Sequence, residues 1–115
     1  MRGDRLRLLD ALEQIQLIRR FSEPGREPFF NDILILLIQS AILHRLALLG
    51  ESCRGISVEL REAYAEIPWT QIIAFRNVVV HEYFGVDLDL VWTVITEHIA
   101  PLASSIESIL ESLPD

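Results

Sequence analysis

Residues 76–83 read RNVVVHEY, and four of their side chains, Arg76, Asn77, His81 and Tyr83, have types and spacing that suit phosphate chemistry. Arginine stays charged and presents a planar fork of donors to phosphate oxygens. Histidine titrates near neutral pH, so it can take or give a proton under working conditions. This pair suits cleavage of a phosphodiester without a metal, with the 2′-hydroxyl of RNA as the internal nucleophile. DNA lacks that hydroxyl and would not be cut.

The segment around these residues has the apolar rhythm of a helix. At about 100° per residue, the four polar residues span less than half of the helical wheel, and Phe75, Val78 and Val79 occupy the other side. One face is therefore expected to pack in the core while the polar face reaches a surface or cleft. Asn77 and His81 are four residues apart, so the amide is placed to touch the imidazole and hold one of its nitrogens.

Arg76 and His81 are five residues apart and diverge on the same wheel. Two copies of this helix facing each other across a dimer axis would bring them to one substrate more easily. Spacing alone leaves a structural or solvated role open, because arginine and histidine often share a helix.

Helical spacing of apolar residues recurs along most of the chain, and no segment shows convincing strand alternation. Helices are predicted over residues 4–21, 29–56, 57–65, 68–84 and 88–113, with the SEPGREP stretch breaking the first from the second. The predicted architecture is an all-α bundle of four to five helices. The residues expected to start, weaken or end helices are Gly50, Gly55, Pro68, Gly85 and either Asp87 or Asp89, with a kink or break near Pro101.

A length of 115 residues, half of them apolar, predicts one domain with a core, residues 1–115. The first twenty residues mix charged side chains into the apolar period, which argues against a signal peptide. The most apolar stretch, residues 33–50, is interrupted by polar side chains, which argues against a membrane span. A cytoplasmic protein is expected. The single cysteine, Cys53, cannot form an internal disulfide and fits a reducing compartment.

The charge of the chain is unevenly distributed. All ten basic residues are arginines within residues 1–76, where ten acidic residues balance them, so the net charge of -7 falls entirely after Arg76. The acidic C-terminal third repels nucleic acid, which argues against a general DNA or RNA coat protein. There is room only for a local basic site.

RNVVVHEY resembles the RX4HXY signature of HepT-type HEPN domains, and FGVDLDLVW continues as it does in that family. LLGES resembles the family's IGEA segment in the long second helix, and IPWTQIIAFRN resembles the lead-in to the motif, so the likeness covers roughly residues 4–112. One departure is Ser52, which replaces the alanine that many relatives carry after the glutamate. The resemblance implies an HEPN-type homodimer whose motif helices face a cleft.

The activity implied by this resemblance is that of a ribonuclease toxin in a type VII toxin and antitoxin system. Arg76 would bind the phosphate and stabilise the transition state, His81 would be the acid or base, and Asn77 would be their polar organiser. No metal or cofactor would be needed to cut the RNA, which is tRNA or mRNA in some members, and the product would be a cyclic phosphate. The implied partner is an MntA-like minimal nucleotidyltransferase antitoxin, which uses ATP to transfer AMP to Tyr83 and so blocks RNA binding.

Another function remains open for the same fold, a catalytically silent HEPN interaction module that assists a partner nucleotidyltransferase. Other sites are weaker candidates. GESCR begins like the G-x-S-x-G elbow of hydrolases, but its fifth residue is Arg54 and no strand precedes it. His44, His81 and His98 lack neighbouring cysteines or paired carboxylates, so no metal site is predicted.

The remaining polar and aromatic candidates have two possible roles each. Trp69 and Trp92 are expected to pack in the core or anchor helix ends rather than stack on bases. Arg45 and Arg54 would either line the cleft or pair with local acids. Glu82 would either orient an arginine or lie on a solvated face.

Overall fold

The computed structural model describes residues 2–26, 35–82 and 85–114. These residues form α1 (Arg2–Ser22), α3 (Ile35–Arg54), α4 (Val58–Ala63), α5 (Trp69–His81), α6 (Leu88–Thr93), the π-helical turn η2 (Val94–His98) and α7 (Ile99–Ser112). Because α6, η2 and α7 follow one another directly, the described part of the chain consists of five helical units and contains no strand. The predicted all-α bundle is confirmed.

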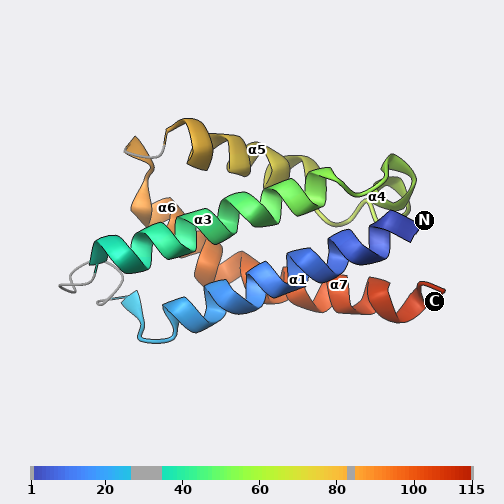
Figure 1. Ribbon diagram of the computed structural model, residues 1–115, viewed down its shortest axis with the longest axis horizontal. Coiled ribbons are helices and arrows are strands. Elements are labelled where there is room, and N and C mark those ends of the chain that lie inside the picture. The colour runs from blue at the N-terminus through green and yellow to red at the C-terminus, as the bar shows by residue number, and fades with distance from the viewer. Residues whose placement is uncertain (1, 27–34, 83–84, 115) are drawn as a thin grey trace.

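The helices lie along the long axis of a body that measures 46 × 26 × 20 Å (Figure 1). The central helix α3 packs against α1 on one side and α5 on the other, and α7 packs against α1. The main neighbour of α5 is α3. The position of α5, which carries the RNVVVHEY residues up to His81, is therefore set by its contact with α3.

The core is built from one apolar stripe on each long helix. In α1 the stripe has helical spacing of three and four, as the sequence predicts. The residues with no exposed surface are Leu8, Ala11, Ile15 and Ile18 of α1, Ile42 and Cys53 of α3, Val91 of α6, and Ile106 of α7. Burial of stripes from four elements against one another supplies the main stabilisation of the fold.

A buried acid ties α1 to α4. Asp4 is only 2% exposed, and its carboxylate accepts hydrogen bonds of 2.7 Å from both the backbone N–H and the hydroxyl of Ser57. The Ser57 hydroxyl oxygen in turn accepts a bond of 3.2 Å from the backbone N–H of Leu60, which caps α4. These bonds satisfy the buried carboxylate and fix where α4 starts.

The start of α5 agrees with the prediction from the IPWT stretch. Pro68 is the N-cap residue, and Trp69, which is 5% exposed, is the first helical residue. The Trp69 indole donates a hydrogen bond of 3.0 Å to the carbonyl oxygen of Tyr64, whose hydroxyl lies 3.0 Å from the Ser112 hydroxyl of α7. Trp69 therefore anchors the helix start, as expected.

One predicted helix end agrees with the structure and another was wrong. The second helix was expected to continue to residue 56, and α3 stays helical through Gly50 to Arg54, because glycine weakens a helix without ending it when packing holds the turn. At the other site α5 ends at His81 and not at residue 84, since Glu82 leaves the helical conformation at φ -120° and ψ 33°. The predicted beginning of the second helix, over residues 29–34, lies outside the described residues.

The last helix is capped as predicted and breaks earlier than predicted. Asp87 accepts hydrogen bonds from the backbone N–H groups of Asp89 and Leu90 at 3.0 and 3.3 Å. The irregularity is the wide π turn η2, and α7 continues through Pro101. Proline has no N–H and its ring crowds the carbonyl four residues earlier, here Glu97, so a wider turn that includes Glu97 relieves the conflict.

Several side chains lie where the sequence places them. Trp92 packs partly buried against the core, and both His44 and His98 are exposed. Within the described ranges, no helix combines the length and the apolar content needed to cross a bilayer.

Cys53 generates a prediction about pH. Burial raises the pKa of its thiol to about 12, while the nearby charge of Arg61 opposes the rise. Because the thiol of an unfolded chain ionises near pH ~8.5, the stability contributed by the neutral thiol is complete below that pH. It is lost progressively as the pH rises toward 12. Urea midpoints measured from pH 7 upward should therefore fall more steeply for the wild type than for Cys53→Ala. Identical pH slopes would contradict this.

Candidate functional site

Arg76 lies on the face of α5 that packs against α3. Ile72, Arg76 and Val79 follow one another at spacings of four and three, Val79 is 2% exposed, and Ile72 packs against the core. The expectation that Phe75, Val78 and Val79 form the packed side is confirmed for Val79 and, in part, for Phe75, but it was wrong for Val78, which is 37% exposed. The contact with α3 falls between the polar and apolar sectors of the wheel.

Gly50 makes this position of Arg76 possible. A Cβ at Gly50 would collide with the Cβ of Arg76 and lie 2.9 Å from its Cγ and 3.3 Å from the carbonyl oxygen of Ile72. The two helices therefore approach most closely where α3 has no side chain. The stem of Arg76 crosses this bare strip of backbone, and its guanidinium emerges at the edge of the helix pair.

Two neighbours hold the Arg76 guanidinium. Its NH2 nitrogen lies 3.3 Å from the Glu51 carboxylate, and its NH1 nitrogen donates a hydrogen bond of 3.0 Å to the Asn77 side-chain oxygen. The side chains of Arg76 and Glu51 are 26% and 47% exposed, so this ion pair contributes only ~0–1 kcal/mol to stability. Its larger effect is orientation. A guanidinium has five N–H donors, and several remain to bind a phosphate.

The motif residues are only partly brought together. Asn77 binds Arg76, and no hydrogen bond joins it to His81 in the described part of the chain, contrary to the expected contact. His81 is exposed and is the last residue of α5, whereas Arg76 is half-buried against α3. Tyr83 lies outside the described residues. Within one chain, the arginine and the histidine are presented on the same helix at different faces.

Two residues of this site were missed in the sequence. Gly50 was interpreted only as a helix weakener, and Glu51 had no role, although both lie in the LLGES segment. The available signal was a glycine inside a long apolar helix, which often marks a close helix contact. Glu82, considered as an orienting acid, is instead the exposed C-cap of α5.

The two arginines of α3, Arg45 and Arg54, are not part of this site. Arg45 donates a hydrogen bond of 3.1 Å to the buried Gln14 of α1, and Arg54 is exposed. Ser52, the departure from the family pattern, is 7% exposed. It therefore affects packing rather than the surface beside Arg76.

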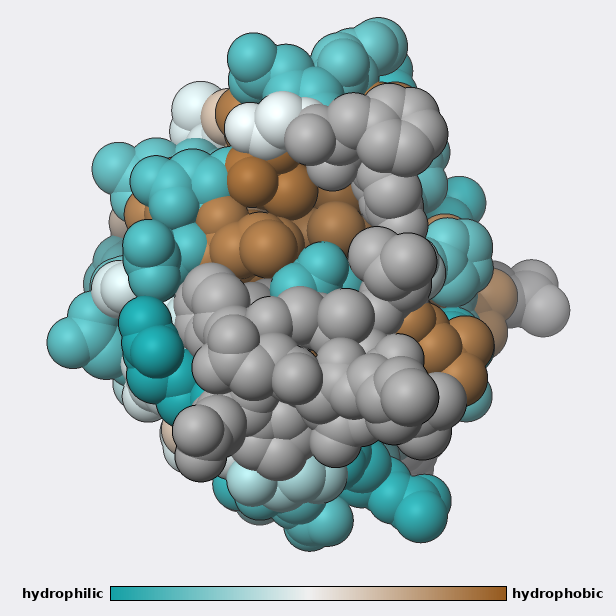
Figure 2. Space-filling model, turned by 90° about the vertical axis from the view of Figure 1, so that its left-hand side faces the viewer, coloured by the Kyte–Doolittle hydropathy of each residue, from teal (hydrophilic) through white to brown (hydrophobic). Residues whose placement is uncertain are grey.

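Two surface hollows lie away from Arg76 and His81. One, at the elbow between α4 and α5, and another, between α5 and the α6–α7 helix, each measure about 470 Å³, and neither is lined by Arg76 or His81. The described residues contain no group of three or more potential metal ligands. Figure 2 views the left-hand end of the bundle in Figure 1, where an apolar area is exposed beside the residues drawn in grey.

Comparison with known proteins places these features in a family. Residues 11–109 match the family described as "Ribonuclease HepT-like". A Methanocaldococcus jannaschii protein named "Gamma-glutamylcyclotransferase and putative RNase" is 35% identical over 115 residues, which cover 98% of this chain and 50% of that protein. The "Probable ribonuclease HepT" of Thermococcus cleftensis is 33% identical over 103 residues, covering 89% of this chain and 91% of that protein. The chain thus spans half the length of the first relative. No solved structure matches the chain significantly.

The helix contact at Gly50 generates a prediction. Gly50→Ala should destabilise the protein by about 1–3 kcal/mol, because the added methyl overpacks the contact with Arg76. Gly3→Ala is the matched control, since nothing lies within 4 Å of a Cβ at Gly3 in α1. There the methyl should stabilise the helix by about 0.5–1 kcal/mol. Urea unfolding measures both changes, and equal stabilities of the two variants would refute the close contact.

Proposed function

The chain belongs to the HepT-like ribonuclease family, and on that basis we propose that it cleaves RNA as a homodimer and acts as the toxin of a type VII toxin and antitoxin pair. The observation that carries the proposal is the guanidinium of Arg76, held at the edge of the α3–α5 contact by Glu51 and Asn77. Five residues further on, the same helix ends in an exposed His81. One helix thus carries a group that binds phosphate and a group that transfers protons, on different faces.

In the proposed reaction Arg76 binds the oxygens of the phosphate to be cut. The phosphate competes with Glu51 for the guanidinium, and Asn77 keeps its plane in place. His81 takes the proton of the 2′-hydroxyl as that oxygen bonds to phosphorus. The bond from phosphorus to the 5′-oxygen then breaks, and the leaving oxygen receives a proton from an imidazolium. The products are a 2′,3′-cyclic phosphate and a 5′-hydroxyl, and no metal or cofactor takes part.

A homodimer supplies what one chain lacks. Since Arg76 faces α3 and His81 lies exposed at the helix end, a twofold axis beside α5 would pair Arg76 of one copy with the partner's His81. It would also provide one imidazole for the 2′-hydroxyl and another for the leaving oxygen. Val80, which lies closer than Val78 to Arg76 on the helical wheel of α5, is 44% exposed, and contact with a second copy would cover it.

Control by an MntA-like minimal nucleotidyltransferase antitoxin is the regulatory half of the proposal. The antitoxin transfers AMP from ATP to the hydroxyl of Tyr83, which follows His81 by two positions. The added phosphate charge repels the RNA backbone and the adenosine blocks access to His81. The substrate is a tRNA or an mRNA.

A second candidate is a catalytically silent module that assists the nucleotidyltransferase. The observation in its favour is that neither of the two hollows of about 470 Å³ is lined by Arg76 or His81. Isolated expression separates the two candidates, because a silent module does not arrest growth.

Substitution of His81 tests the nuclease. His81→Ala should lower RNA cleavage by about 100-fold or more, because proton transfer is lost. His44→Ala, which removes an equally exposed histidine from α3, should cut like the wild type. The measurements are single-turnover cleavage by the purified protein and growth on expression without the partner. Equal growth of wild type and His81→Ala, together with no cleavage of RNA, would remove the nuclease reading.

Intact mass tests the modification. Co-expression with the antitoxin and ATP should add one or more AMP units to the wild type. Tyr83→Phe should gain none, because the acceptor hydroxyl is missing. Tyr64→Phe is the matched control, since Tyr64 is the other tyrosine of the chain and lies at the far end of α5. AMP that still appears on Tyr83→Phe would place the acceptor elsewhere.

A further inference from the structure

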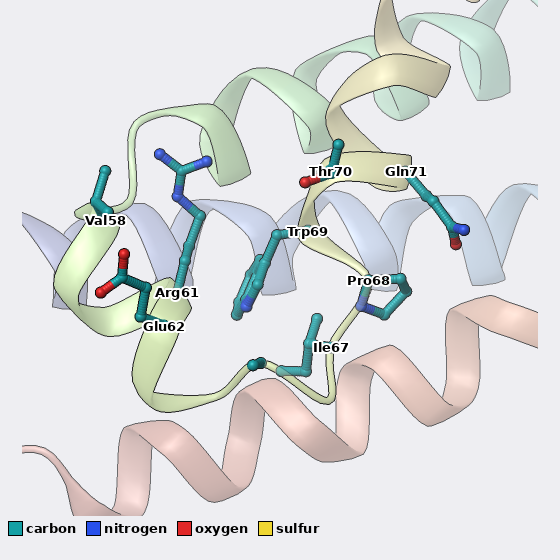
Figure 3. A pocket seen from close by; sticks show the side chains of 9 residues that line it. Val58, Arg61, Glu62, Ile67, Pro68, Trp69, Thr70 and Gln71 are labelled. Atoms are coloured by element: carbon teal, nitrogen blue, oxygen red, sulfur yellow. The ribbon is translucent and has the colours of Figure 1, made fainter.

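The hollow at the elbow between α4 and α5 has the composition of an anion site. Arg61 and Glu62 of α4 and Trp69 and Thr70 of α5 are among the residues that line its volume of about 470 Å³. Figure 3 shows the Arg61 side chain and the Trp69 ring facing the same space, with the Thr70 hydroxyl directed toward the side on which Arg61 lies. A cation, a hydroxyl and an aromatic edge thus surround one opening.

The guanidinium of Arg61 forms no hydrogen bond or ion pair with any residue that the structure describes. Its Nε atom has less than 1 Å² of accessible surface and no hydrogen-bond partner in the described part of the chain. No carboxylate there lies within ion-pair distance of it either. Removing a cationic N–H group from water without a partner is costly. A bound anion would accept hydrogen bonds from the terminal nitrogens and balance the charge of the guanidinium.

The first turn of α5 adds donors on the same side. Pro68 provides no side-chain cap, and the first hydrogen bond within the helix runs from the Ile72 N–H to the Pro68 carbonyl at 3.0 Å. The N–H groups of Thr70 and Gln71 consequently find no acceptor among the described residues. Open N–H groups at the start of a helix of 13 residues carry partial positive charge and favour anions.

A continuous strip of α5 connects this hollow to the motif. Thr70, Ala74, Asn77 and His81 are all exposed and follow at spacings of four, three and four, so they lie along one side of the helix. From Thr70 to His81 the strip is about 16 Å long at 1.5 Å per residue. The small side chain of Ala74 leaves the middle of the strip open to close approach by a nucleic acid strand. A nucleic acid strand of several nucleotides spans this length.

We propose that this hollow binds a backbone phosphate of the RNA strand whose scissile phosphate lies at Arg76 and His81. The inference rests on the proposed function and extends it by setting where along the strand the cut falls. Arg61 and the first turn of α5 hold this remote phosphate. The RNA strand runs along the strip from Thr70 to His81.

The fixed helix starts determine the geometry of this site, and Glu62 adds a negative charge to it. Asp4 and Ser57 fix the start of α4, and the bond from Trp69 to Tyr64 fixes the start of α5, so the cation and the helix end are preorganised. Glu62 opposes the anion, although Figure 3 shows its carboxylate on the side of Val58 and away from Thr70. Removing the charge of Arg61 and removing the charge of Glu62 should therefore change the affinity for an anion in opposite directions.

The test uses 2′-O-methyl RNA, which lacks the nucleophilic hydroxyl and stays intact. Arg61→Gln should weaken binding of a long oligonucleotide by about 10-fold, the loss of one charge-assisted contact. Glu62→Gln should strengthen it several-fold. Arg20→Gln, which removes an exposed arginine from α1, should change it little. A dinucleotide, which is too short to reach from His81 to the hollow, should lose less affinity in Arg61→Gln than the long oligonucleotide does.

Inorganic phosphate alone provides a direct readout. It should shift the NMR signal of the buried Arg61 Nε–H in the wild type, and circular dichroism checks that each variant is folded. If Arg61→Gln does not fold, Thr70→Val removes the hydroxyl instead and should weaken the oligonucleotide several-fold. Wild-type affinity in Arg61→Gln or Thr70→Val, or no gain in Glu62→Gln, overturns the site. If these bindings behave as expected but unmodified RNA is never cut, only the proposed nuclease function fails.

Discussion

The close approach of α3 and α5 at Gly50 is the constraint on which the rest of the site depends. α5 packs mainly against α3, so the rotation of α5 about its own axis is decided at this contact. Because Gly50 has no side chain, an arginine stem fits where an apolar residue would otherwise pack. The same contact brings Glu51, the next residue of α3, within 3.3 Å of the guanidinium. One missing side chain thereby determines both where Arg76 lies and which acid orients it.

The sequence predicted the helices better than their mutual orientation. Apolar spacing gave five helical units, and local chemistry gave the start of α5 at Pro68 and the cap at Asp87, because these depend on neighbours in the chain. A helical wheel shows which residues share a side but not which side meets another helix. For this reason the packed position of Arg76 and the exposure of Val78 were not foreseen. The bond between Asn77 and Arg76 depends on the side-chain rotamer that Glu51 imposes, which spacing does not specify.

The electrostatics of the molecule are local rather than global. The net charge of -7 lies entirely after Arg76, yet the chain places individual guanidinium groups at chosen points of the bundle. Arg45 donates a hydrogen bond within the bundle, to the buried Gln14 of α1. Arg76 lies 3.3 Å from the carboxylate of Glu51, whereas no carboxylate of the described residues forms an ion pair with Arg61. The acidic net charge is therefore compatible with RNA binding, because screening in salt solution limits the electrostatic interaction of each exposed charge to about 10 Å.

The π turn η2 keeps the last helix in phase with the core. Val91, Ile95 and Ile99 are all buried, and each follows the previous one by four residues. In an α-helix of 3.6 residues per turn, a step of four overshoots by about 40°, so two such steps would swing Ile99 away from the side of Val91. The wider winding over Val94–His98 cancels much of this drift. A chain one residue shorter in this stretch would roll all of α7 about its axis and bring Glu107 to the place where Ile106 is now buried.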